Sequence, residues 1–211
     1  MQNGRLGAGM TMSQAAPSRA GRRPETRQRL LDGLLAAICE KGYQSTTVAD
    51  IVRHARTSRR TFYQWFDTRE DCYVALMDRS DLELRDQVAA SVDTGAVWTE
   101  QIRQAVLAYV DHVMANSAII LSSIRDLPSL GTPALAQKRR TFDSLAHLLI
   151  QMVDGERFRE AGVEPPSRAT AHLLLGGVQE LTAMLVEDGD DPRDMTETVV
   201  TAVVAVLAAR A

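Results

Sequence analysis

Two adjacent arginines open a short polar segment near the front of the 211-residue chain. Arg59 and Arg60 are followed by Thr61 and Gln64, and Ser58 before them is a favourable helix N-cap. An arginine fork matches the O6 and N7 acceptors of guanine, and hydroxyl and amide groups bind phosphates or base edges. We therefore expect this segment to read duplex DNA. The alternative is that both arginines are solvated surface charges.

Aromatic side chains alternate with these polar groups. Phe62 and Phe66 are four residues apart, so both face the interior of a helical domain. Tyr63 and Trp65 flank the exposed face, and each has a polar tip that can reach a phosphate oxygen. Half-buried packing is the alternative for both, and above all for Trp65.

A helix of this kind needs a small domain that holds it against a groove about 12 Å wide. The apolar spacing predicts a first helix over about 25–41, a second from Thr47 to about His54, and a third from Ser58 to about Phe66. Asp67 and Thr68 then open a long helix to about residue 91. Three short helices with a tight break before the last are typical of a helix-turn-helix. Its core would contain Leu34, Ile38, Val48, Ile51, Val52, Phe62 and Phe66.

The same residues resemble a known family. The chain reads Gly-Tyr-Gln-Ser-Thr-Thr-Val-Ala-Asp-Ile-Val over 42–52, Ser-Arg-Arg-Thr-Phe-Tyr-Gln-Trp-Phe over 58–66, and Arg-Glu at 69–70. This pattern resembles the DNA-binding signature of the TetR family of bacterial regulators over roughly residues 26–80. One departure lies in the turn, where the family often has glycine and this chain has Arg56. A left-handed turn there would strain the arginine, which has the alternative role of a phosphate contact.

The resemblance implies DNA contacts by nine residues. Helix N-termini and the threonine and serine hydroxyl groups would bind phosphates, and the adjacent Arg59 and Arg60 would read bases. The two aromatic residues, the glutamine and Arg69 would hold the DNA backbone. In chain order these residues are Thr47, Ser58, Arg59, Arg60, Thr61, Tyr63, Gln64, Trp65 and Arg69.

Charge is distributed unevenly along the chain. Residues 1–70 contain twelve basic and six acidic side chains, a net charge of +6. Because the whole chain has a net charge of −3, the remainder carries −9. A basic end on an acidic body suits a polyanion partner. Residues 1–23 lack a hydrophobic period and are interpreted as a disordered basic arm. The alternative is that its arginines, including Arg19, Arg22 and Arg23, reach a minor groove.

The rest of the chain has helical periods and no convincing strand pattern. Helices are expected at about 98–116, 118–127, 133–154, 168–187 and 194–210, with Thr132 as N-cap of the third. The prediction is an all-α fold of about nine helices. It has an arm (1–23), a helix-turn-helix DNA-binding domain (24–70) and a helical effector-binding and dimerisation domain (71–211).

The resemblance implies a small-molecule pocket in the second domain. Candidate ligand contacts there are the large apolar and polar side chains Trp98, Tyr109, His112, Met114, Phe142 and Met152. Core packing is the alternative for each of them. The implied effector is a small, largely apolar molecule.

The last predicted helix is apolar nearly all round, and in the apolar helix before it Gly176 and Gly177 would permit close helix approach. Two such helices from each subunit would form a four-helix dimer interface. Its candidate residues are Leu173, Gly177, Leu181, Met184, Val199, Val203 and Val206. The alternative is that both helices only complete the core of the monomer.

Other classes of protein find no support. The sequence has no nucleophile elbow, phosphate loop or dinucleotide fingerprint, so an enzyme is not expected. Four dispersed histidines and two isolated cysteines, expected to be packed thiols, predict no metal site, and no cofactor is expected. No apolar run is expected to span a membrane, and a cytoplasmic location is expected.

These observations predict a homodimeric repressor that a ligand releases from double-stranded operator DNA. A DNA-binding activator, or a regulator that answers a protein partner, remains an open alternative. The sequence identifies neither the effector nor the operator.

Overall fold

The computed structural model describes residues 22–126 and 130–209, which contain helices and no strand. The predicted all-α fold is confirmed. Residues 1–21, and with them most of the predicted arm, lie outside the described residues.

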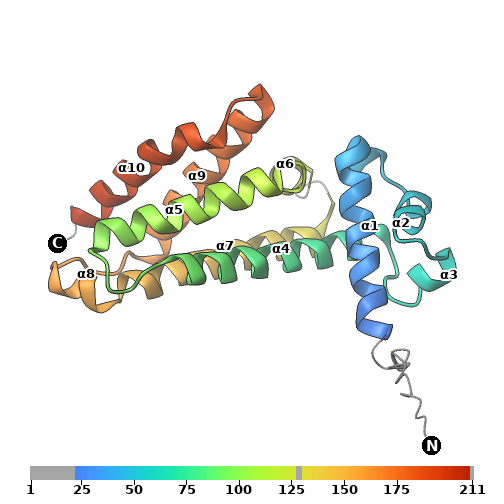
Figure 1. Ribbon diagram of the computed structural model, residues 1–211, viewed down its shortest axis with the longest axis horizontal. Coiled ribbons are helices and arrows are strands. Elements are labelled where there is room, and N and C mark those ends of the chain that lie inside the picture. Colours follow the sequence, from blue (N-terminus) through green and yellow to red (C-terminus); the bar gives the residue numbers. More distant parts are fainter. Residues whose placement is uncertain (1–21, 127–129, 210–211) are drawn as a thin grey trace, which may run out of the picture.

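Three helices form a head at one end of the molecule (Figure 1). They are α1 (Arg22–Ser45), α2 (Val48–His54) and α3 (Arg59–Phe62). Helix α1 packs against α2, and α3 follows α2 after a tight turn. This is the predicted helix-turn-helix arrangement.

The remaining helices form an elongated body (Figure 1). Helices α4 (Arg69–Ser91) and α7 (Thr132–Val153) run from the head along the body, with α5 (Trp98–Ala115) packed on α4. Helices α9 (Arg168–Asp188) and α10 (Thr196–Ala208) pack on α7 and α5 respectively. Helix α6 (Ser117–Arg125) lies at the head end of the body and contacts α1.

The head and the body share a helix and a core. Tyr73 and Leu76 of α4 are buried in the same cluster as Leu34, Ile51 and Phe62 of the head, and Ile119 of α6 joins it. The second half of α4 belongs to the core of the body through Leu84 and Val88. The predicted domain boundary at 70/71 falls in the first turn of α4, which continues unbroken from the core of the head into the core of the body.

The helices that begin at Val48, Arg59 and Arg69 each start after a capping residue. The side chains of Thr47, Ser58 and Thr68 each accept a hydrogen bond from the backbone amide three residues on, as N-caps do. Asp50 and Asp71 complete capping boxes with the two threonines. Ser167 caps α9 in the same way, as expected.

Several predicted boundaries were wrong. Helix α1 begins earlier and is followed to Ser45 across a break at Gly42, where φ is 75°. Helix α3 ends at Phe62, although hydrogen-bonded turns continue to Phe66. The N-cap of α7 is Gly131 rather than Thr132.

Two further elements were not predicted. A short helix, α8 (Glu156–Glu160), follows α7, and the 3-10 helix η2 (Pro192–Met195) precedes α10. Proline stands at the first position of η2, where its missing amide hydrogen costs no hydrogen bond. The expectation for the cysteines also fails in part, because Cys39 is exposed and only Cys72 is buried.

Gly33 sets the distance between α1 and α2. A Cβ atom at this position would lie 2.5 Å from the Ile51 carbonyl oxygen and 2.9 Å from the Ala55 amide nitrogen. Both atoms belong to the backbone of α2, so neither can move without moving the helix. Sequence analysis missed this role, although an isolated glycine inside a helical pattern is a signal of close packing.

We expect Gly33→Ala to destabilise the head by about 1–3 kcal/mol, because overpacking forces the two helices apart. Chemical denaturation measures the change. The matched control is Gly95→Ala in the α4–α5 loop, where the nearest atom would be the Asp93 Oδ1 at 3.3 Å. Equal stability of the two variants would show that α2 adapts to the added methyl group.

Candidate functional site

Helix α3 presents two cations with no partner. Arg59 and Arg60 are exposed, and within the described residues neither side chain has an ion pair or a hydrogen bond. Ser58 accepts from the Thr61 amide at 3.1 Å, and their hydroxyl oxygens lie 2.9 Å apart. The helix start is thus fixed, while the two guanidinium groups remain available to a ligand.

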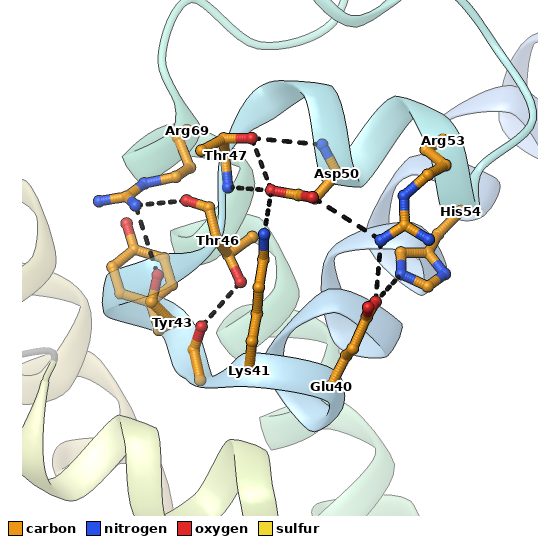
Figure 2. Close-up of polar contacts among 10 residues, drawn as sticks. Glu40, Lys41, Tyr43, Thr46, Thr47, Asp50, Arg53, His54 and Arg69 are labelled. Carbon is orange, nitrogen blue, oxygen red and sulfur yellow. Dashed lines mark hydrogen bonds and ion pairs between the residues drawn. The ribbon is translucent and has the colours of Figure 1, made fainter.

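The neighbouring basic side chains of α2 are paired with acidic groups within the head (Figure 2). The Arg53 guanidinium and the His54 Nε2 lie 2.8 and 2.7 Å from the same carboxylate oxygen of Glu40. The hydrogen bond from Arg53 is the largest cause that lowers the pKa of Glu40. These contacts join α2 to the end of α1, so the cations that face outward are those of α3 and the turn before it.

Thr47 lies at the start of α2, where a phosphate contact was predicted. Its amide and its hydroxyl both donate to Asp50 Oδ2, at 2.9 and 2.6 Å. The Lys41 ammonium lies 2.6 Å from the same oxygen (Figure 2), and its hydrogen bond is the largest cause that lowers the Asp50 pKa. Because both donors of Thr47 are engaged, a phosphate at this helix end would meet the backbone amides of Val48 and Ala49, the first of α2.

Arg69 lies inward rather than toward solvent. Its Nη1 donates to the carbonyl oxygens of Thr46 and Tyr43 at 2.6 and 3.3 Å (Figure 2). Its Nη2 lies 3.0 Å from Glu70 Oε1. The guanidinium also lies 4.3 Å from the centre of the Tyr43 ring. These contacts tie the start of α4 to the α1–α2 corner, and the side chain is 23% exposed.

The other predicted DNA contacts differ in exposure. Tyr63 is 56% exposed and Gln64 is exposed, so both are accessible beside α3. Trp65 is half-buried against the head core, the arrangement of the packing alternative.

The turn before α3 has the expected strain. Arg56 has a φ of 49°, the left-handed conformation that glycine adopts more readily. Arg29 stabilises this turn by donating to the carbonyl oxygens of Ala55 and Arg56, at 3.0 and 3.1 Å from its Nη2. The exposed side chain of Arg56 adds a third outward cation beside Arg59 and Arg60.

An apolar cavity of about 140 Å³ lies in the body. It is partly open to solvent and is lined by side chains from α4, α5, α7, α9 and α10. Three predicted ligand residues, Tyr109, Phe142 and Met152, line it. The sequence missed most of its wall, including Leu84, Val88, Ile102, Ala105, Val106, Leu149, Val178, Gln179 and Val203.

The other three predicted ligand residues lie elsewhere. Trp98 packs with its ring centre 5.9 Å from that of Phe158. His112 is buried with Nε2 3.2 Å from the Ser80 hydroxyl, and burial lowers the pKa of this imidazole. Met114 is 37% exposed. None of these three residues lines the apolar cavity. Helical spacing alone does not show which apolar face of α5 meets a cavity.

The predicted dimer residues fall into two groups. Leu173 and Met184 of α9 are 75% and 51% exposed, and Gly177 lies between them on the same side. Val199 and Val203 of α10 are buried in the core of the body, while Leu181 and Val206 are half-buried. For Val199 and Val203 the structure thus agrees with the monomer-core alternative.

Helix α9 also bears on the expectation that no segment spans a membrane. By its length and composition α9 is apolar enough to cross a membrane, and 17% of its most apolar 18-residue stretch is buried in this chain. The expectation was wrong on that criterion.

An exposed, cationic recognition helix on a capped helix pair defines the molecule as a helix-turn-helix DNA-binding protein. Comparison with known proteins agrees. Residues 30–76 match the model for bacterial regulatory proteins of the tetR family. The head of this chain is therefore similar to the DNA-binding segment of tetR-family regulators, and its curated relatives are transcriptional regulators.

Curated relatives are similarly described. The HTH-type transcriptional regulator BetI of Cronobacter sakazakii is 29% identical over 183 residues, covering 74% of this chain and 90% of the relative. The uncharacterized HTH-type transcriptional regulator YdgC of Bacillus subtilis is 24% identical over 178 residues, covering 83% of this chain and 89% of the relative.

Solved structures share the fold over most of the chain. The transcriptional regulator FadR of Bacillus subtilis, solved in complex with stearoyl-CoA, has a TM-score of 0.71 at 15% identity, covering 82% of this chain and 95% of its own. FadR of Bacillus halodurans has a TM-score of 0.73 at 16% identity, covering 83% of this chain and 93% of its own.

Proposed function

We propose that the chain is a homodimeric repressor that leaves its operator when a small, largely apolar ligand fills the cavity of the body. Residues 24–70 form the DNA-binding domain of this proposal, and residues 71–211 bind the ligand and the second subunit. The observation that carries it is the position of α4, which lines the cavity through Leu84 and Val88 and is buried in the head core through Tyr73 and Leu76.

In this proposal Arg59 and Arg60 read bases, because they are the free cations at the start of α3. Thr61, Tyr63, Gln64 and Ser58 contact the DNA backbone around them. Trp65, Thr47 and Arg69 act mainly by holding the head together, since each is packed or hydrogen-bonded within it.

The cavity supports an apolar effector. A 150 Å³ apolar cavity holds a molecule as large as benzene, so an empty volume of about 140 Å³ accepts a small hydrocarbon group without rearrangement. The stearoyl-CoA bound to FadR of Bacillus subtilis supports an apolar ligand in this fold.

Repression then depends on the distance between two heads. Half-sites on B-DNA are about 34–36 Å apart, and a dimer matches that spacing only in one arrangement of its heads. A ligand that binds better to the other arrangement shifts the equilibrium, typically by about 1–3 kcal/mol.

Filling the cavity tests this proposal. We expect Ala105→Leu to lower the affinity for 1-octanol at least about tenfold, because the larger side chain occupies the ligand volume. Operator affinity should change less than about threefold, since Ala105 lies far from α3 in the chain's fold. Calorimetry and fluorescence anisotropy measure the two affinities.

The matched control is Ala90→Leu, the same change on the exposed side of α4. Undiminished octanol binding by Ala105→Leu would place the ligand outside this cavity. In transcription from the upstream region of its own gene, added protein should lower the transcript and octanol should restore it. A rise in transcript with added protein would favour an activator.

The exposed face of α9 supports the dimer. We expect Met184→Asp to raise the dimer dissociation constant at least about 30-fold, because a buried charge at an interface anchor costs about 2 kcal/mol or more. Sedimentation of the full chain measures this constant. Leu82→Asp, at a 60% exposed position of α4, is the control. A monomeric unaltered protein would contradict the proposal.

A further inference from the structure

A second, polar pocket adjoins the apolar cavity. It lies among α4, α6, α7 and α9, and Phe142 and Gln179 line both spaces. Its wall carries the hydroxyl, amide and charged side chains of Ser80, Asp81, Ser123, Gln137, Lys138 and Thr141. A ligand that extends from the cavity past Phe142 would therefore meet polar groups.

Asp81 is the acidic group of this pocket, and it is held in place. Gln137, which is 1% exposed, donates from Nε2 to Asp81 Oδ2 at 3.0 Å, and the Thr141 hydroxyl donates to the same oxygen. Within the described residues, Asp81 Oδ1 has no hydrogen bond and the carboxylate has no ion pair. One oxygen is thus fixed from α7, and the other is available.

The charges around Asp81 do not neutralise it. On α4 and α7, Asp78 and Arg140 lie 3.7 Å apart and pair with each other. The Lys138 ammonium lies 6.0 Å from the centre of the Phe142 ring. On α5, His112 is bonded to Ser80, and burial lowers its pKa and favours the neutral form. A carboxylate with little access to water is stable when a cation is paired with it, and within the described residues Asp81 has no such ion pair, although Lys138 lines the same pocket.

We infer that the effector is an amphipathic cation, with an apolar body in the cavity and an ammonium or amidinium group paired with Asp81 Oδ1. This inference rests on the proposed function, and it adds the charge and the orientation of the ligand. The cationic end would lie beside Ile119, Ile120 and Ser123 of α6, the body helix that contacts α1. The charged group therefore lies at the end of the ligand nearer the head.

Three probes with one hydrocarbon chain test the inference: n-octylammonium, 1-octanol and octanoate. We expect the full-length protein to bind octylammonium at least tenfold more tightly than octanol, and octanoate most weakly. Asp81→Asn should remove this preference and leave octanol affinity within twofold. Asp78→Asn removes the same charge one turn away, outside the pocket wall, and should keep the preference.

The ranking on the unaltered protein requires no variant, so it stands even if Asp81→Asn folds poorly. If octylammonium and octanol bound equally tightly, the inference of a cationic effector would be overturned. If Ala105→Leu also lost both ligands, the apolar cavity would still be the ligand site. Preference for octanoate would also overturn it and would indicate pairing with Lys138. Failure of all three probes to bind would overturn both the inference and the proposed cavity.

Discussion

Replacing Arg59 and Arg60 together by alanine is expected to weaken operator binding by at least about 30-fold. Each arginine that reads a base contributes about 1–3 kcal/mol of discrimination, and the two together contribute at least about 2 kcal/mol. The free energy of unfolding should change by less than about 0.5 kcal/mol, because both side chains are exposed and neither has an ion pair or a hydrogen bond within the described residues. Fluorescence anisotropy with an operator duplex, and urea denaturation, measure the two quantities.

The control for this prediction removes the same charge elsewhere. Arg139 and Arg159 are exposed residues of the body. Their replacement by alanine should lower the affinity for the operator only by weakening the long-range electrostatic attraction between protein and DNA. Equal losses for the two double variants would mean that net charge, rather than α3, determines binding. A fall in stability with the loss of Arg59 and Arg60 would show that these side chains support the head.

Replacing Asp81 by asparagine is expected to stabilise the protein at pH 7. Burial is the largest cause that raises the Asp81 pKa, from 3.8 to about 6. The carboxylate is therefore less favourable in the folded chain than in the unfolded chain. A shift of this size corresponds to at most about 3 kcal/mol, and the amide removes that cost while still accepting from Gln137 and Thr141.

The sign of the pH dependence follows from the raised pKa. Between about pH 4 and pH 6 the folded state binds more protons at Asp81 than the unfolded state does, so its stability falls as the pH rises. Above about pH 6 this loss is complete. The difference in stability between Asp81→Asn and the unaltered protein should therefore grow from pH 4 to pH 6 and then remain constant.

Thermal denaturation of both proteins across this range measures the difference. Asp78→Asn is the control, since its side chain is 52% exposed and its replacement should leave stability almost constant. A destabilised Asp81→Asn variant at pH 7 would contradict the prediction. A stabilised variant that no longer prefers octylammonium would show that Asp81 binds ligand at the expense of stability.

Local signals predicted the head almost completely. N-caps at Thr47, Ser58 and Thr68 and the apolar pair Phe62 and Phe66 depend on residues close in sequence, so short-range patterns reveal them. Elements with weaker local signals were missed or displaced. Helix α8 is only five residues long, and the last predicted helix is divided after Met195.

The site was harder to predict where partners lie far apart in the chain. Arg59 and Arg69 both occupy helix N-termini, but the carbonyl groups that bind Arg69 belong to Tyr43 and Thr46, 26 and 23 residues away. Nothing in the local sequence distinguishes an arginine tied to such distant groups from a free one. Likewise, Trp98 packs on Phe158 whereas Tyr109 reaches the cavity, and periodicity is the same for both.

Equilibrium binding to two duplexes tests most directly whether α3 reads DNA sequence. One duplex carries the region upstream of the protein's own gene, and the other has the same bases in shuffled order. At physiological salt we expect at least about a 10³-fold preference for the first duplex, and an affinity that falls as salt increases. Equal binding of the two duplexes, or no binding of either in 50 mM salt, would contradict this reading of α3.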